Sequence, residues 1–536
     1  MRRDPDALTT RRWDLLVIGG GIHGLFAAWD AAQRGLSVAL VDAADFGGGV
    51  SFNHQRTLHG GLRALQQGAL RKARRQIEER RAWARIAPHM VRPLPFLIGT
   101  YREIKRSRLA LRAGFRMYDW IGRSRNAGVA MELHLPKTRL ESAATTRKLF
   151  PGIAPKGLTG GAIWYDYQTR HPDRLTWLVA CAARRAGATL VNYVRATGPR
   201  RAADGRVTGA TLRDELDGRE LEVAACVTLL TPGAGLGDLL QAFGAGEGPP
   251  LLRAMNLLLA RPARDIALAA PGRSGRMLTA VPWAGSLLVG TAQSETIVAA
   301  GQGAPSTAEV HAFLADANSA FPALQAQADA VRLVHWGLTP AVVRHGRDEL
   351  RPEAEITKHA TQRLIAMAGV KYTTARAAAE QAIDAAVAIA AKPTRRCRTA
   401  DTPLPHATIA DVEGRLAETQ RALGVELAAD ISTHLASWYG TEAPDVLNHA
   451  AAHGEIDRLD PASPVLAGEI SYAVEHADAI RLSDAVLRRT VLGSAGRPGR
   501  AALDRAAAIM ARLCGWSPEQ IEREIEFVER RYVIGT

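Results

Sequence analysis

The stretch DLLVIGGGIHGLFAAWDAAQRGLSVALVD, residues 14–42, decides the fold of this chain. Its apolar start predicts a buried strand, after which Gly19, Gly21 and Gly24 follow at GxGxxG spacing. In such a turn the first glycine bends the chain, the second lets the backbone approach a pyrophosphate, and the third lets the helix pack closely on the strand. The small-residue helix that follows points its positive N-terminus at the phosphates. The stretch therefore predicts a dinucleotide-binding βαβ unit.

The second strand of this unit ends at Asp42, about 20 residues beyond the glycines. A carboxylate at this place accepts hydrogen bonds from ribose hydroxyls and repels a 2′-phosphate. The acid therefore favours FAD or NAD over NADP. A GxGxxG sequence alone would also fit a glycine-rich turn, but here the strand, the helix and the acid accompany it.

Length and composition indicate the number of domains and the class of protein. With 536 residues and 47% hydrophobic residues, we expect two or three globular domains. No uncharged apolar run is long enough for a transmembrane helix, and the N-terminal MRRDPDALTTRR lacks the apolar stretch of a secretory signal. We expect a reduced, cytoplasmic protein without a metal site, because the cysteines lie far apart and lack zinc-ligand spacing: Cys181, Cys226, Cys397 and Cys514.

Downstream of the first unit, short apolar runs bounded by turn residues predict strands at residues 189–198 and 286–292. Residues 206–235 predict a small meander that runs into a buried strand and a glycine turn. Residues 363–369 predict another strand, which leads through Gly369 to Thr373 and Thr374 at the start of an alanine-rich helix. This helix start would also face an anion, although a simple helix cap is the alternative. After a polar link near residues 392–405, amphipathic helices dominate. We therefore place the domains at residues 1–392 and 393–536.

The positive charge is concentrated in residues 71–125, which hold sixteen lysines and arginines against four acids, a net +12 of the chain's +14. Within them, SRLALRAGFRMYDWIG at residues 107–122 alternates arginines with aliphatic and aromatic residues. This pattern is typical of a segment that lies on an anionic membrane surface. We expect no nucleic-acid partner, because no recognition motif accompanies the charge. An arginine-rich, solvated pair of helices is the alternative.

In this order, the segments resemble the FAD-dependent glycerol-3-phosphate dehydrogenases of the D-amino-acid-oxidase-like flavoprotein superfamily, over nearly the whole chain. The similar stretches are VIGGGIHG, TLHGGLRAL, FRMYDWIG, AVPWAGSLLVGTA, AGVKYTTAR and AIRLSDAVLRRT. The resemblance implies an α/β fold class, with a Rossmann-type FAD-binding domain, an inserted mixed or antiparallel-sheet substrate domain and a C-terminal all-helical domain.

The resemblance also implies an activity, namely hydride transfer from a small secondary alcohol such as glycerol 3-phosphate to flavin N5, with a membrane quinone as the acceptor. His59 is our candidate base, because an imidazole with a pKa near 6.5 accepts a proton at working pH. A loop histidine that only bonds backbone is the alternative. Arg63 and Lys371 would place positive charge beside the substrate and the flavin N1/O2 edge. The expected FAD-binding residues are Gly19, Gly21, Gly24, Asp42, Ser51, Leu58, Val194, Gly233, Gly369, Lys371, Thr373 and Thr374.

The chain departs from the family pattern where the family holds the substrate phosphate. Arg63 is followed by Ala64 instead of tyrosine, and a family arginine is replaced by Thr339. A second family arginine aligns with Lys358, which keeps the charge but loses the bidentate fork. We take Thr339, Lys358 and Arg344 as the substrate-binding candidates, with His345 and Arg347 near the last.

These departures keep two other functions open. The first is a repurposed flavin oxidase or dehydrogenase for another alcohol, a hydroxy acid or an amine. The second is a non-catalytic, flavin-stabilised interaction protein, against which His59, Arg63 and Lys371 argue. The chain would act in the cytoplasm, peripherally on the inner face of the cell membrane. Its oligomeric state is open at this stage, with a homodimer as one candidate.

The loop after Asp42 also departs from the family, because GGGVSFNHQRT at residues 47–57 replaces a serine-rich stretch. Three consecutive glycines can bring backbone N–H groups close to an anion, or form a plain surface turn. In some amine-oxidising relatives a histidine in this region carries the flavin covalently, and His54 lies nearby. The register differs by one residue, so we expect non-covalent FAD.

Overall fold

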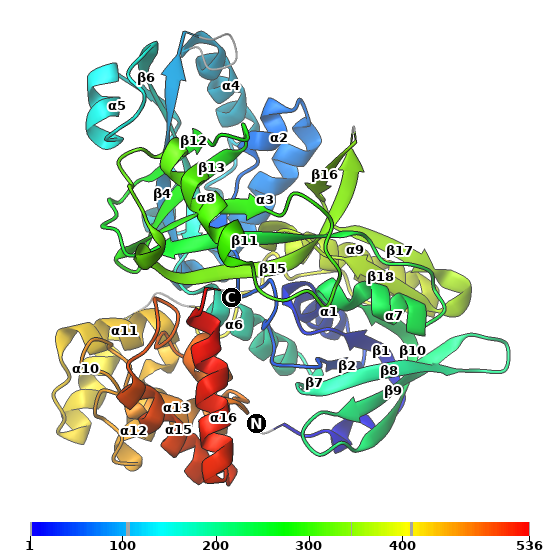
Figure 1. The fold of residues 1–536 in the computed structure, drawn as a ribbon. Helices are drawn as coiled ribbons and strands as arrows, with labels where there is room; N and C mark the ends of the chain where they lie inside the picture. The colour runs from blue at the N-terminus through cyan, green and yellow to red at the C-terminus, as the bar shows by residue number, and fades with distance from the viewer. Residues whose placement is uncertain (1–2, 103–107, 345, 408–410, 535–536) are drawn as a thin grey trace.

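The computed structural model describes residues 3–102, 108–344, 346–407 and 411–534. Two sheets and a group of C-terminal helices make up the molecule (Figure 1). This arrangement confirms the predicted fold class: a parallel Rossmann-type sheet, a second, mainly antiparallel sheet and a helical C-terminal part.

The first sheet carries the fingerprint at its centre. Its main strands, in spatial order, are β17 (Glu355–His359), β18 (Leu364–Ala368), β10 (Glu220–Leu230), β1 (Trp13–Ile18), β2 (Val38–Val41) and β7 (Thr189–Val191). All neighbours run parallel except β17, which is antiparallel to β18.

Both faces of this sheet are covered, which explains the unbroken apolar run at β1. Leu15 and Val17 face a core shared with the helices α1 (Ile22–Gln33), α6 (Pro172–Arg185) and α9 (Ala375–Ala390). Leu16 and Ile18 face the opposite core, to which α7 (Leu236–Ala242) contributes.

The strand expected at residues 189–198 is two strands, β7 and β8 (Val194–Arg201). The chain turns between them at Asn192 and Tyr193, where Tyr193 adopts a left-handed φ of 54°. The buried Asn192 amide holds this corner by donating to Asp45 Oδ1 at 3.3 Å and to the Asp478 carbonyl at 3.1 Å. Propensity alone does not reveal such a corner, because its partners come from distant segments. β8 then pairs with β9 (Val207–Asp214), which pairs with β10.

The second sheet is larger and mainly antiparallel. In spatial order its strands are β16 (Arg347–Leu350), β15 (Val331–Arg344), β11 (Leu251–Leu259), β14 (Ser286–Gln293), β13 (Met277–Trp283), β12 (Ala267–Pro271), β4 (Val91–Tyr101), β6 (Leu158–Thr169) and β3 (Thr57–Leu58), with β5 (Arg139–Glu141) also on β6. The helices α8 (Thr307–Ala320) and α5 (Ala143–Leu149) contribute to one core of this part, and α4 (Arg108–Ile121) contributes to another. Two further helices, α2 (Leu62–Gln66) and α3 (Leu70–Ile86), lie between β3 and β4 in the chain.

The C-terminal helices gather on one side of the molecule (Figure 1). They are α10 (Val412–Leu423), α11 (Ala429–Tyr439), α12 (Ala443–Ala452), α13 (Ala467–His476), α14 (Leu482–Asp484), a π-helical turn (Ala485–Arg489), α15 (Arg500–Cys514) and α16 (Pro518–Glu529). Among the helices that the structure describes, none is long and apolar enough to cross a membrane.

A buried ionic contact docks these helices on the loop that follows Asp42. Asp45 accepts hydrogen bonds from Arg488 Nε at 2.6 Å and from both terminal nitrogens of Arg489 at 2.9 and 2.6 Å. Burial opposes ionisation of Asp45, but the two guanidinium groups keep its pKa below the ordinary value. The cofactor edge and the C-terminal helices are therefore held together by charge.

Candidate active site at the edge of the parallel sheet

The carboxyl ends of the parallel strands form one edge where the predicted cofactor residues meet. From β1 the chain crosses to β2 on one side, while β10 pairs with β1 on the other. A crevice for a nucleotide is expected at such a switch point. Gly19 follows β1, Asp42 follows β2, Gly233 follows β10 and Gly369 follows β18. The topology therefore brings together residues from four distant segments.

The local geometry at the fingerprint glycines fits the roles that their spacing predicts. Gly19 has a φ of 112°, and a Cβ at Gly19 or Gly24 would overlap the backbone of Thr231 or of Gly19. At Gly21 a Cβ would meet one atom within 4 Å, Ser51 Oγ at 3.3 Å. Ser51 Oγ in turn accepts the Ile22 N–H at 2.9 Å. The backbone at Gly21 is thus open beside the N-terminus of α1, which fits a pyrophosphate.

Backbone N–H groups orient the carboxylate of Asp42, the predicted ribose-binding acid. Its two carboxylate oxygens accept N–H groups of Gly20 at 2.6 Å and Ala44 at 2.8 Å. Burial raises the pKa of Asp42 to about 6 although these hydrogen bonds favour the carboxylate. At pH 7 the group is mainly ionised and can accept hydroxyl protons. Val194 contributes only backbone here, because its side chain is buried and its N–H donates to the Asp42 carbonyl at 2.7 Å.

The turn after β18 joins the two sheets. Thr373 Oγ1 accepts the His59 N–H at 3.2 Å, and the Thr373 carbonyl accepts the indole N–H of Trp83 at 3.1 Å. Lys371 adopts a left-handed φ of 60°, and Thr374 begins α9. Leu58, directly before His59, is fully buried, so only its backbone can reach a cofactor.

His23, inside the fingerprint, packs against this turn. A Cβ at Gly369 would come within 2.7 Å of His23 Nδ1, so the turn needs glycine there. Burial lowers the pKa of His23 to about 4, which keeps the ring neutral. Its Nε2 is buried and has no partner among the described residues. An unpaired polar atom at this edge fits a site shaped for a further polar group.

His59 lies where the two sheets meet, and its ring contacts the carboxylate of Asp166. Its side chain is 53% exposed, and its Nδ1 lies 3.4 Å from Oδ2 of the buried Asp166 on β6. Asp166 is fixed by the Gly60 N–H at 2.8 Å and by a contact with Arg80. Burial opposes ionisation of Asp166, but hydrogen bonding to His59 and the charge of Arg80 keep its pKa below the ordinary value. Asp166 therefore orients the ring so that Nε2 is available.

Positive charge collects near the turn at Lys371. Lys371 is exposed at the turn, where desolvation and the neighbouring charges of Lys72 and Arg63, partly offset by Glu353, lower its pKa to about 8. Arg63 also acts on Arg276, whose pKa is lowered by desolvation and by that like charge. We call Arg63, Lys72, Arg276 and Lys371 the cation cluster. Like charges held this close favour an anionic ligand.

The predicted substrate-binding residues are spread along the rim. Thr339 is half-buried on β15. Two residues before it, the loop residue Val50 packs against Gly337. Lys358 is exposed on β17. Arg344 is exposed at the end of β15 in an open groove of about 240 Å³ that Arg351, Glu353 and Glu355 also line. His345, its predicted neighbour, lies outside the described residues.

His54 lies inside the site rather than at its edge. Its ring stacks on Tyr372 with centroids 4.4 Å apart, and its Nδ1 accepts the Arg56 N–H at 3.0 Å. Burial and the charge of Arg56 lower its pKa to about 3, so the ring is neutral. Non-covalent FAD stays a prediction.

Sequence reasoning missed Asp166 and Arg276. Asp166 had a signal, because an acid inside the aromatic strand WYDYQT at residues 164–169 is an unusual core residue. Arg276 had no such signal, because it lies in a glycine-rich turn at residues 272–276 that also holds Arg273.

The fold and site are those of a flavoprotein oxidoreductase, and comparison with known proteins agrees. The family model described as FAD dependent oxidoreductase matches residues 14–385, and that of the C-terminal domain of alpha-glycerophosphate oxidase matches residues 397–521. The cofactor is therefore FAD, as predicted.

Full-length relatives make the assignment more specific. The chain is 31% identical to a glycerol-3-phosphate dehydrogenase of Mycobacterium leprae, over 96% of this chain and 87% of that protein. It is 28% identical to one of Synechocystis, over 98% and 97%. The fold matches the glycerol-3-phosphate dehydrogenase of Bacillus halodurans complexed with FAD, with a TM-score of 0.76 at 24% identity over 99% and 96% of the two chains. The chain belongs to the family of FAD-dependent glycerol-3-phosphate dehydrogenases.

The free space beside the backbone of Gly21 leads to a prediction about FAD binding. Gly21→Asp should abolish FAD binding, because the new carboxylate would occupy the open backbone face and repel the pyrophosphate. Flavin absorbance per chain after purification measures this. Gly303→Asp is the matched control, since a Cβ there meets nothing within 4 Å and the residue is exposed, outside the predicted cofactor segments. Full flavin content in the Gly21 variant would contradict the site assignment.

Proposed function

We propose that the protein oxidises the secondary alcohol of glycerol 3-phosphate. The observation that carries this proposal is that His59, which Asp166 orients, is hydrogen-bonded through its backbone N–H to the turn at Lys371, a member of the cation cluster. A phosphorylated alcohol needs both a proton acceptor and an anion site. FAD, when bound, supplies the hydride acceptor.

His59 is the proposed base. With Nδ1 directed at Asp166, the neutral ring carries its lone pair on Nε2, which takes the hydroxyl proton as the carbon loses hydride. Asp166 then stabilises the charged ring, as a positioning residue. The exposure of His59 leaves Nε2 within reach of a ligand.

The cation cluster is the proposed phosphate site. The charge of Arg63 helps to lower the pKa of Arg276, and an anion between the two side chains would relieve that repulsion. A charge-assisted hydrogen bond contributes about 1.5 to 3 kcal/mol. This arrangement would compensate for Thr339, which lacks the guanidinium of the family pattern. Lys371 would balance negative charge that develops during oxidation.

Anaerobic bleaching of the flavin tests the function. Glycerol 3-phosphate should bleach the wild-type flavin, whereas glycerol at equal concentration should bleach it far more slowly. His59→Ala should keep its FAD but bleach about a hundredfold more slowly, because general-base catalysis typically contributes that much or more. His311→Ala, on the exposed face of α8, is the control.

Other bleaching results would favour a different function or a different base. Faster bleaching by a hydroxy acid or an amine than by glycerol 3-phosphate would favour the alternative, a repurposed flavin enzyme, which Ala64 and Thr339 support. Bleaching by none of these compounds, with flavin bound, would favour a non-catalytic protein. Unchanged bleaching in His59→Ala would move the base to another residue.

We also propose that the protein binds an anionic membrane through α4 and passes electrons to a quinone there. The outer face of α4 carries Leu109 and Trp120, which are 79% and 68% exposed, beside the exposed Arg112 and Arg116. Phe115 does not belong to this face, contrary to the sequence pattern, because it is buried against the second sheet. Apolar and basic side chains on one helix face suit a lipid surface.

The surroundings of α4 support this proposal. An open groove of about 810 Å³ lies beside Trp120, and Arg116, Arg123 and Lys137 contribute to its wall. α4 also lies at the opposite end of the molecule from α10 and α12, so nothing from the C-terminal helices covers it (Figure 1). Residues 103–107 of the basic segment, including Arg106, lie outside the described residues.

Co-sedimentation with vesicles tests the membrane proposal. The protein should bind phosphatidylserine-containing vesicles at low salt and partly detach as salt rises, since the attraction decays within about 8 Å at physiological ionic strength. Arg112→Glu/Arg116→Glu should abolish binding, while Arg200→Glu/Arg206→Glu on the β8–β9 hairpin should not. Absence of binding to anionic vesicles at low salt would contradict the proposal.

A further inference from the structure

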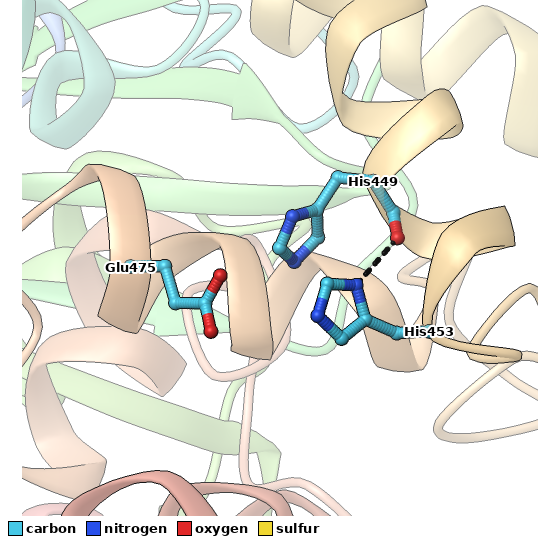
Figure 2. Close-up of side chains that lie close together, drawn as sticks. All are labelled: His449, His453 and Glu475. Carbon is cyan, nitrogen blue, oxygen red and sulfur yellow. Dashed lines mark hydrogen bonds between the residues drawn. The ribbon is translucent and has the colours of Figure 1, made fainter.

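A cluster of three metal-ligand residues lies on the C-terminal helices, away from the flavin edge. His449 is on α12, His453 follows one turn later, and Glu475 reaches the same point from α13 (Figure 2). One ligand atom from each residue lies within 4.8 Å of the others. His453 is exposed, and the other two are half-buried.

The spacing of the two histidines has a physical reason. Residues four apart on a helix lie on the same face, so His449 and His453 bring their rings to a centroid distance of 4.2 Å. Glu475 belongs to a different helix, so the cluster is formed by packing and does not appear as a sequence motif. The cysteine spacing that led us to expect no metal site could not have revealed it.

The hydrogen bonds around the rings leave ligand atoms available. His453 Nδ1 donates to the His449 carbonyl at 2.8 Å, so in the neutral ring the lone pair is on Nε2. His449 Nε2 lies 2.9 Å from the hydroxyl of the buried Ser471, which itself donates to Glu455. A metal-bound histidine commonly has its second nitrogen held by a carbonyl or a similar group.

The arrangement also suits a metal. Two imidazole rings four residues apart along the chain and a carboxylate from a second helix bring their ligand atoms around one common point. Ligand atoms around tetrahedral zinc lie roughly 3.3 Å apart, so small rotations of the exposed His453 and of Glu475 would close the site.

We propose that His449, His453 and Glu475 bind one divalent transition-metal ion of the Zn²⁺ type, with water as the fourth ligand. Two imidazole nitrogens and a carboxylate oxygen are ligands that Zn²⁺ accepts. The ion would bridge α12 and α13 and so stabilise the C-terminal helices. The proposal is independent of the substrate.

Calorimetric titration of chelator-treated, FAD-loaded protein with ZnCl₂ tests this site. Wild-type protein should bind one Zn²⁺ per chain, and His453→Ala and Glu475→Gln should each weaken binding at least tenfold. His311→Ala, which removes an exposed helix histidine outside the cluster, should bind as wild type does. Flavin content of each variant checks that it is folded.

Thermal unfolding gives a second, independent measurement. Zn²⁺ should raise the melting temperature of wild-type protein and of His311→Ala, and leave that of His453→Ala unchanged. No zinc binding by the wild type, or equal binding by His453→Ala and Glu475→Gln, would overturn the proposal. Loss of binding in His311→Ala alone would place the ion elsewhere and also overturn it.

Discussion

The hydroxyl of Thr373 joins the two sheets, and the active site depends on this contact. By accepting the His59 N–H, it places the end of β3 in the second sheet beside the turn that ends β18 in the first. His59 then lies near Lys371, and Arg63 follows on α2. Positive charge is therefore concentrated where a base is available, and neither sheet alone would create that combination.

The ionic contact at Asp45 supports this edge from the opposite side. Asp45 lies three residues beyond Asp42, the predicted ribose-binding acid, and Arg488 and Arg489 hold it from the C-terminal helices. Breaking one partner of a buried ion pair costs about 3 to 5 kcal/mol, because the remaining charge stays buried. The C-terminal helices thus help to fix the loop after Asp42, although they lie outside the cofactor edge. Arg531 adds a second contact by donating to Asn53 at 2.6 Å.

The cofactor edge could be predicted from the sequence because it depends on local chemistry. Features that depend on packing between distant segments could not. The fingerprint and the turn at Gly369 follow from glycine and acid positions, because their roles depend on a few consecutive residues. The support of His59 by Asp166 and the position of Arg276 depend on contacts between distant strands. The corner at Tyr193 and the burial of Phe115 were missed for the same reason. The spacing of His449 and His453 was visible in sequence, but the approach of Glu475 to them was not.

In the proposed function, Arg276 and Arg63 hold the substrate phosphate in place of the family arginine that Thr339 replaces. Steady-state kinetics with an artificial electron acceptor tests it through the ratio of kcat/KM for glycerol 3-phosphate to that for glycerol. Arg276→Ala should lower this ratio at least tenfold, since one lost charge-assisted bond costs about 1.5 kcal/mol or more. Arg273→Ala, which removes an exposed arginine from the same turn, should leave it unchanged. An unchanged ratio in Arg276→Ala would contradict the claim.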